Sequence, residues 1–88
     1  MISVNVTVLN RLGLHARPAA KLTQKGNEFL CDIRIRKDER EVNGKSIMGV
    51  MLLAASKGTE LTITADGTDE QDAIAQIKQL FDSGFGED

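Results

Sequence analysis

The feature that most constrains the fold is the alternation of apolar and polar residues in several short stretches of the chain. Near the N-terminus, for example, the odd positions from Ser3 to Thr7 are polar, and Val4, Val6 and Val8 are apolar. A strand of this kind buries only one side. We therefore expect helices to cover one face of a sheet and water to cover the other.

The spacing of apolar residues predicts the elements of the rest of the chain in the same way. It predicts strands at 2–8, 29–36, 40–43 and 61–64, and helices at 16–25, at 47–54 and between Thr68 and Gly84. This order, βαββαβα, is that of the α+β class: an open-faced β-sandwich in which three helices cover one face of a four-stranded sheet. The pattern leaves the strand order open, and a ferredoxin-like arrangement remains an alternative.

Local signals set the expected boundaries. Gly26-Asn27 should end the first helix, and Gly58 should end the second. Thr68 to Gln71 has the S/T-x-x-E/Q pattern of a capping box, and the helix after it presents one apolar stripe. The acidic tail, 84–88, is expected to be frayed.

The length, charge and composition of the chain argue against several classes of function. The 88 residues suffice for one domain, 1–88, but not for an elaborate buried catalytic pocket. With 11 basic and 13 acidic residues the net charge is −2, which argues against nucleic acid as the main partner. Apolar runs stay far below the roughly 18 residues of a membrane span, and Met1 opens directly onto a strand pattern. We expect a cytoplasmic protein that does not insert into membranes.

One histidine and one cysteine are too few for a zinc site, and we expect neither a metal nor a cofactor. Cys31 alternates with Ile33 and Ile35, which is typical of a small core residue rather than a redox centre.

The candidate site is the segment 13–20, which holds the only histidine and the only proline. Pro18 suits the first turn of a helix that begins near Ala16. His15 would then lie where the positive end of the helix dipole and unbonded backbone N–H groups favour an anion such as phosphate. Arg17 adds a guanidinium that binds two phosphate oxygens. The same surroundings favour the neutral imidazole, whose nitrogen lone pair is a nucleophile.

A histidine at a helix start has a simpler interpretation as a surface or capping residue. A Ser-His-Asp hydrolase is poorly supported, because the chain has no nucleophile elbow.

Three segments carry a family resemblance. Gly13 to Ala19 resembles the active-site signature of the phosphocarrier proteins HPr of the bacterial phosphoenolpyruvate-dependent phosphotransferase system. Lys45 to Met51 resembles the regulatory serine segment of that family, and Ala55 to Thr59 resembles the stretch before its last strand. The likeness covers essentially the whole chain in register. It implies an antiparallel sheet in the order 1-4-2-3.

The resemblance implies a function for His15. It would accept a phosphoryl group on Nδ1 from the phosphohistidine of enzyme I and pass it to IIA components. Arg17 and the backbone N–H groups of Ala16 and Arg17 would stabilise charge on that group. The chain would be a carrier without turnover of its own, rather than an enzyme in the ordinary sense.

Ser46 stands where a helix N-cap belongs, and alone it would be interpreted only as a cap. The resemblance implies phosphorylation by a dedicated kinase, HPr kinase/phosphorylase, which reduces acceptance at the histidine. A phosphate of roughly −1.5 to −2 charge would repel an acidic partner surface, so regulation would act on docking.

The helix after Ser46 is a candidate interface. Val50, Leu53 and Ala54 are expected to face inward, and this leaves Ile47, Met48 and Met51 for an exposed apolar patch or, in the simpler interpretation, for the core. The basic residues Arg17, Lys21 and Lys45 would steer acidic partners to it. Ala20 and Lys21 extend the expected interface, and we expect a monomer.

Other functions stay open. The chain is alternatively a regulatory binding module controlled by Ser46, or a small acid–base enzyme that uses His15. Within the family, 45–51 resembles the sugar-type carriers, whereas 80–85 resembles the nitrogen-related paralogue, whose role is mainly regulatory.

Overall fold

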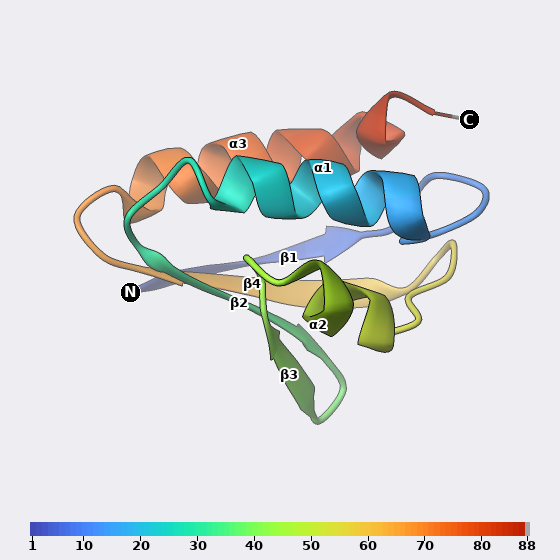
Figure 1. Ribbon diagram of the computed structural model, residues 1–88, viewed down its shortest axis with the longest axis horizontal. Coiled ribbons are helices and arrows are strands. Elements are labelled where there is room, and N and C mark those ends of the chain that lie inside the picture. The colour runs from blue at the N-terminus through green and yellow to red at the C-terminus, as the bar shows by residue number, and fades with distance from the viewer. Residues whose placement is uncertain (88) are drawn as a thin grey trace.

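A computed structural model describes residues 1–87 (Figure 1). Its strands are β1 (Ile2–Thr7), β2 (Asp32–Lys37), β3 (Arg40–Asn43) and β4 (Glu60–Asp66). Its α-helices are α1 (Ala16–Gly26), α2 (Ile47–Leu52) and α3 (Glu70–Asp82), followed by a 3-10 turn, η1 (Gly84–Gly86).

The strands form one antiparallel sheet in the order β1-β4-β2-β3. Ile63 in β4 lies opposite Val4 on one side and Ile35 on the other, and Ile35 in turn lies opposite Val42. One apolar row therefore crosses all four strands. Both the predicted fold class and the strand order implied by the resemblance are confirmed.

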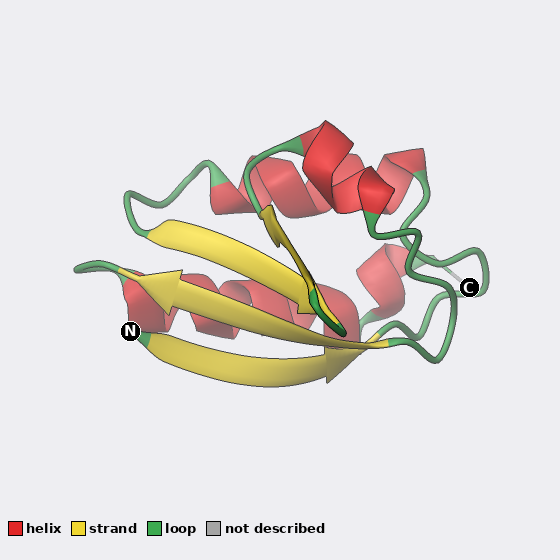
Figure 2. Cartoon of the chain, turned by 90° about the horizontal axis from the view of Figure 1, so that it is seen from below, coloured by secondary structure: helices red, strands yellow, loops and turns green. Residues whose placement is uncertain are grey.

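The helices lie on the apolar side of this sheet. In Figure 1, α1 and α3 run side by side above the strands, while α2 packs against α1 and β3. Ile33, Ile35 and Ile63 are completely buried beneath them. On the other side Arg34 and Arg36 are exposed, and the view from below in Figure 2 shows the strands with no helix in front of them.

Two predicted boundaries are wrong for identifiable reasons. The second strand begins at Asp32 rather than at Phe29. The backbone N–H groups of Leu30 and Cys31 donate to the Asp69 carboxylate, at 2.7 and 2.9 Å, instead of joining the sheet. The second helix ends at Leu52 rather than at Ala54, and Ala54 takes a left-handed conformation with φ of 50°. Ala54 is exposed, so its predicted inward orientation is also wrong.

The capping box predicted at Thr68 does not form. The N-cap of α3 is Asp69, whose side chain closes the loop between α1 and β2 instead of capping its own helix. These N–H donors, with Leu30 the strongest, lower the pKa of the Asp69 carboxyl. A different pair makes a hydrogen bond at this helix start, since Glu70 Oε1 accepts from the Gly67 N–H at 3.0 Å.

The C-terminal segment packs against the rest of the protein as far as Glu87, where the sequence predicts a frayed tail; Asp88 lies outside the described residues. Phe85 is only 2% exposed, and its ring meets that of Phe81 edge to face with centroids 4.8 Å apart. Lys21 Nζ donates to the Phe85 carbonyl at 2.7 Å. This segment is therefore fastened to the core and to α1.

Candidate functional site

The loop between β1 and α1 is braced against the loop before β4. Leu14 N–H donates to the Ala55 carbonyl, and Val8 exchanges hydrogen bonds with Gly58 and Thr59. Gly13 makes this close approach possible: its φ is +71°, and a Cβ there would lie 2.4 Å from the Ala55 carbonyl oxygen. The backbone before His15 thus has a fixed position.

His15 is the N-cap residue of α1, as the sequence predicts. Its backbone is extended, with φ −75° and ψ −171°, and its carbonyl accepts from the Ala19 N–H at 3.0 Å. Its side chain does not cap the helix, and the first turn holds no acidic residue. Among the described residues nothing accepts from the N–H groups of Ala16 and Arg17, so these two donors point out of the helix end without an acceptor.

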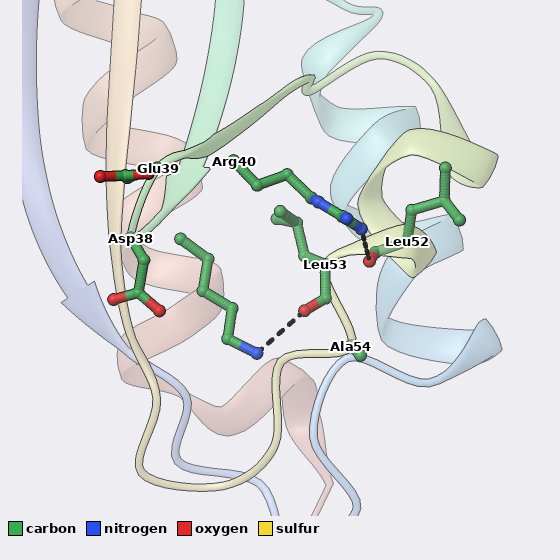
Figure 3. A pocket seen from close by; sticks show the side chains of 7 residues that line it. Asp38, Glu39, Arg40, Leu52, Leu53 and Ala54 are labelled. Carbon is green, nitrogen blue, oxygen red and sulfur yellow. Dashed lines mark hydrogen bonds between the residues drawn. The ribbon is translucent and has the colours of Figure 1, made fainter.

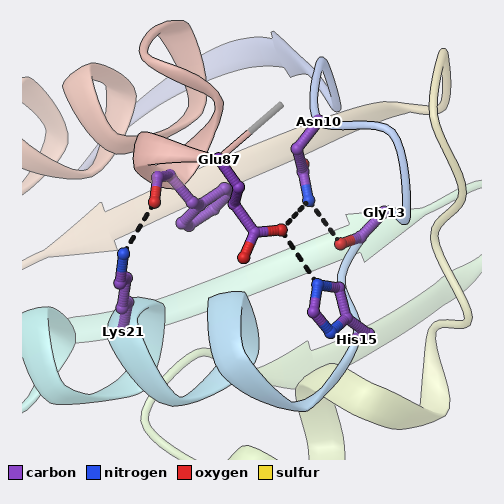
Figure 4. A network of polar contacts seen from close by, with 6 residues as sticks. Asn10, Gly13, His15, Lys21 and Glu87 are labelled. Carbon is purple, nitrogen blue, oxygen red and sulfur yellow. Dashed lines mark hydrogen bonds and ion pairs between the residues drawn. The ribbon is translucent and has the colours of Figure 1, made fainter.

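The imidazole instead contacts the C-terminal segment. His15 Nε2 lies 2.9 Å from Glu87 Oε1, and the side chains are 37% and 20% exposed (Figure 4). A carboxylate is only an acceptor, so the hydrogen in this bond belongs to Nε2. In the neutral ring the lone pair is then on Nδ1.

Asn10 completes this network. It is only 1% exposed, and its Nδ2 donates to Glu87 Oε1 at 3.0 Å and to the Gly13 carbonyl at 2.6 Å. The hydrogen bond from His15, the bond from Asn10 and the positive charge of Arg17 all contribute to lowering the pKa of the Glu87 carboxyl. Glu87 is thus held as a carboxylate beside the ring.

These residues border an open hollow of about 350 Å³, which is lined by Arg11, Leu12, His15, Arg17 and Glu87. Arg17 is exposed and makes no hydrogen bond or ion pair through its guanidinium within residues 1–87. The hollow therefore combines a partly exposed imidazole with an Arg17 guanidinium that has no partner within residues 1–87, and it lies beside the helix end that carries the two N–H groups.

Sequence reasoning missed Glu87 and Asn10. Nothing around Glu87 in the sequence singles it out, because its contact with His15 spans 72 positions. Asn10 belongs to a recognisable turn, but its contact with Glu87 spans 77 positions and cannot be read from the local sequence.

Ser46 and His15 lie far apart, near opposite ends of α1. Ser46 Oγ accepts from the Gly49 N–H at 3.1 Å, so it is the N-cap of α2 as predicted. The neighbouring Lys45 carbonyl accepts from Asn27, the residue that follows α1. His15 precedes α1, and the two sites consequently lie at opposite ends of that helix.

The outer side of α2 carries an exposed apolar surface, the α2 patch. Ile47, Met48 and Met51 are 40%, 69% and 42% exposed, as predicted, and Leu52, which sequence reasoning missed, is 62% exposed. Val50 and Leu53 face the core.

The other residues expected around this patch have varied surroundings. Ala20 is half-buried in α1. Lys21 is committed to the Phe85 carbonyl, and Lys45 Nζ donates to the Phe29 carbonyl at 2.7 Å. Arg17 alone among the three predicted steering cations has no such contact within residues 1–87.

A larger hollow, about 400 Å³, lies between the β2–β3 turn and the end of α2 (Figure 3). Lys37 Nζ donates to the Leu53 carbonyl and an Arg40 guanidinium nitrogen donates to the Leu52 carbonyl, each at 3.1 Å. Both cations satisfy carbonyls at the C-terminus of a short helix, a structural task. Across residues 1–87 we find no cluster of three metal-ligating side chains and no helix able to span a membrane.

Comparison with known proteins identifies the family. A family profile described as "PTS HPr component phosphorylation site" matches residues 2–83. The phosphocarrier protein HPr of Xylella fastidiosa (strain Temecula1) is 49% identical over 88 residues, covering 100% of this chain and 99% of the relative.

Comparison with solved structures indicates the same family. HPr-C-His from Thermoanaerobacter tengcongensis has a TM-score of 0.96 at 43% identity, covering 100% of this chain and 99% of that one. Crh of Bacillus subtilis, described as a catabolite repression protein and a domain-swapped dimer, has a TM-score of 0.77 at 44% identity, covering 96% and 97%. The chain belongs to the HPr family of phosphocarrier proteins of the phosphotransferase system.

Proposed function

We propose that this chain carries a phosphoryl group on His15, which it accepts from enzyme I and passes to IIA components in the cytoplasm. The observation that carries the proposal is the position of the imidazole. It lies partly exposed at the N-terminus of α1, beside the outward N–H groups of Ala16 and Arg17, with its Nδ1 lone pair available. The coarser role, a phosphocarrier of the phosphotransferase system, is that of the family.

The chemistry is an exchange of one P–N bond for another. The Nδ1 lone pair of His15 attacks phosphorus, and the electron pair of the breaking bond returns to the nitrogen of the donor histidine. A phosphohistidine keeps a high transfer potential, so the group remains exchangeable; a serine ester would hold it more firmly. The reverse attack by a IIA histidine then unloads the carrier.

The protein contributes positioning and charge. The N–H groups of Ala16 and Arg17 and the Arg17 guanidinium would bind the phosphoryl oxygens, where negative charge concentrates during transfer. The positive end of the α1 dipole adds to the same field. Because the hollow is open, two different enzymes can reach the same nitrogen in turn.

Partners would dock on the α2 patch together with Ala20 and Lys21. Three flexible or branched apolar side chains, Ile47, Met48 and Met51, offer a surface that adapts to more than one protein. Arg17, with its guanidinium directed to solvent, favours an acidic partner. We expect a monomer of one domain, 1–88, and the swapped dimer of Crh makes a solution mass measurement worthwhile.

Ser46 would be the regulatory site, as a substrate of HPr kinase/phosphorylase. Its hydroxyl borders the α2 patch, but the length of α1 separates it from His15. A phosphate there would act on docking through added negative charge, rather than on the imidazole directly.

A regulatory binding module is the second candidate, and the similarity to Crh favours it. In that case partner binding would depend on Ser46 phosphorylation and would survive replacement of His15. The partly exposed imidazole at the helix end favours the carrier, in either a sugar-type or a nitrogen-related pathway.

A transfer experiment tests the carrier. The chain is incubated with enzyme I and ³²P-labelled phosphoenolpyruvate, repurified, and mixed with a IIA domain. We expect label on the chain and then its transfer to the IIA domain, with neither step in H15A. Absence of label on the wild type, with an enzyme I that is active on another carrier, would refute the proposal.

A further inference from the structure

We propose that Glu87 is a positioning residue for His15: it holds the imidazole with hydrogen on Nε2 and presents the Nδ1 lone pair to the incoming phosphoryl group. This inference rests on the proposed function of His15. It assigns a role in transfer to the C-terminal segment, which lies 72 positions away along the chain.

The hydrogen bond between His15 and Glu87 determines which nitrogen of the ring carries the lone pair. Nε2 and Oε1 are 2.9 Å apart, the distance of a good hydrogen bond, and the carboxylate accepts only. Nε2 therefore cannot offer a lone pair while the contact lasts. Of the two ring nitrogens, only Nδ1 remains as a nucleophile.

Glu87 is itself held in place. Its backbone N–H donates to the Gly84 carbonyl at 3.0 Å, and Phe85 anchors the segment in the core. Lys21 fixes the Phe85 carbonyl from the side of α1. A carboxylate on such a fastened turn restricts the imidazole more than one on a loose tail would.

Asn10 supplies a second, independent sign of a built site. Both of its amide hydrogens point to acceptors, one of which is Glu87 Oε1, but its Oδ1 is buried with no partner among the described residues. An unsatisfied buried carbonyl costs stability. Asn10 thus leaves its Oδ1 without a partner among the described residues, while its Nδ2 donates to Glu87 from a buried position.

The carboxylate also complements the change in charge. When Nδ1 forms its bond to phosphorus and the donor nitrogen recovers its electron pair, Nε2 keeps its hydrogen and the ring becomes positively charged. Among residues 1–87, Glu87 is the acidic side chain that lines the hollow, and Arg11 and Arg17 are the cations there. The positive ring is thus stabilised on the edge opposite to the transferred group, as a carboxylate stabilises imidazolium in other histidine sites.

The first test is spectroscopic. Long-range ¹H–¹⁵N spectra of the His15 ring at about pH 9, where an imidazole is ordinarily neutral, report which nitrogen carries the hydrogen. We expect the wild type to show a single form, protonated at Nε2 with a slowly exchanging hydrogen. In E87A the hydrogen should exchange rapidly and both forms should be present, whereas E87Q, which retains an acceptor oxygen, should stay close to the wild type.

The second test is kinetic. We expect E87A to accept phosphoryl groups from enzyme I about three- to tenfold more slowly than the wild type, the loss expected for one partly exposed charge-assisted bond. E87Q should lie between them, since it preserves the tautomer but not the charge. E41A, which removes an exposed glutamate of β3, is the matched control and should equal the wild type.

The outcomes separate the two proposals. A wild-type chain that accepts no phosphoryl group refutes the carrier function itself. A wild-type chain and E87A that accept it at equal rates refute the role of Glu87 and leave the carrier function intact. An unchanged ring spectrum in E87A refutes it as well.

Discussion

Nε2 of His15 lies 2.9 Å from Oε1 of Glu87, although the two residues are 72 positions apart in the chain. The site therefore joins the N-terminus of α1 to the C-terminal end of the described chain. Any change that loosens the C-terminal segment should therefore alter the position of the imidazole.

The first prediction concerns the pKa of Glu87, which the His15 bond lowers from an ordinary value of 4.5. In H15A this pKa should rise toward 4.5. Because the folded value is below the unfolded one, the stabilisation from this contact is present above about pH 4.5 and is lost as the pH falls through the lowered pKa.

A carbon-detected NMR titration of the glutamate carboxyls measures this. Glu70 is the internal control: the Gly67 N–H and the N-terminal ammonium group lower its pKa, and H15A should leave that pKa low. If Glu87 titrates identically in H15A and the wild type, the contact does not exist in solution.

The second prediction concerns Gly13. In G13A the new Cβ would lie 2.4 Å from the Ala55 carbonyl oxygen at a left-handed φ, and the loop before His15 must shift. We expect a loss of about 2–4 kcal/mol in the free energy of unfolding by urea, together with slower phosphoryl acceptance.

G58A is the matched control. Gly58 also has a positive φ, +90°, but a Cβ there meets nothing within 4 Å. It should cost only the backbone strain, about 1 kcal/mol, and leave acceptance unchanged. Equal losses in the two variants would show that the close approach to Ala55 is unimportant.

The third prediction concerns Phe85, which is buried and packs against Phe81. F85A should destabilise the fold by about 3–5 kcal/mol in urea unfolding and should also raise the pKa of Glu87, since the turn that carries Glu87 loses its anchor. L30A removes a side chain that is 90% exposed and should change stability by less than about 0.5 kcal/mol. A small loss in F85A would mean that the tail is frayed after all.

The fourth prediction concerns the cap of α2. S46A removes the acceptor for the Gly49 N–H and should lower the free energy of unfolding by about 1 kcal/mol, without affecting the His15 ring spectrum. S56A is the control and should be nearly neutral, since the hydroxyl of Ser56 makes a long, exposed contact of 3.4 Å to the hydroxyl of Thr59. Perturbed His15 signals in S46A would contradict the separation of the two sites along α1.

The sequence predicts the architecture well because its signals are local. One-faced alternation in the strands, Pro18 in the first turn of α1 and the serine before α2 all act over a few residues. The strand order, in contrast, came from the family resemblance, since the period of a strand does not reveal its neighbour.

The failures come from tertiary contacts, which the local sequence pattern does not reveal. The Asp69 carboxylate binds the N–H groups of Leu30 and Cys31 instead of capping α3, and this moves the start of β2 as well. Phe85 converts an acidic tail, expected to fray, into part of the core. Half of the candidate site followed from the motif around His15, and the half supplied by Asn10 and Glu87 required the folded chain.

The most direct test of the central claim is the intact mass of the protein after incubation with phosphoenolpyruvate and enzyme I, beside H15A. We predict a gain of one phosphate that is labile in acid, as expected for a P–N bond, in the wild type and no gain in H15A. An acid-stable phosphate, or an equal gain in H15A, would place the phosphoryl group elsewhere and contradict His15 as the carrier residue.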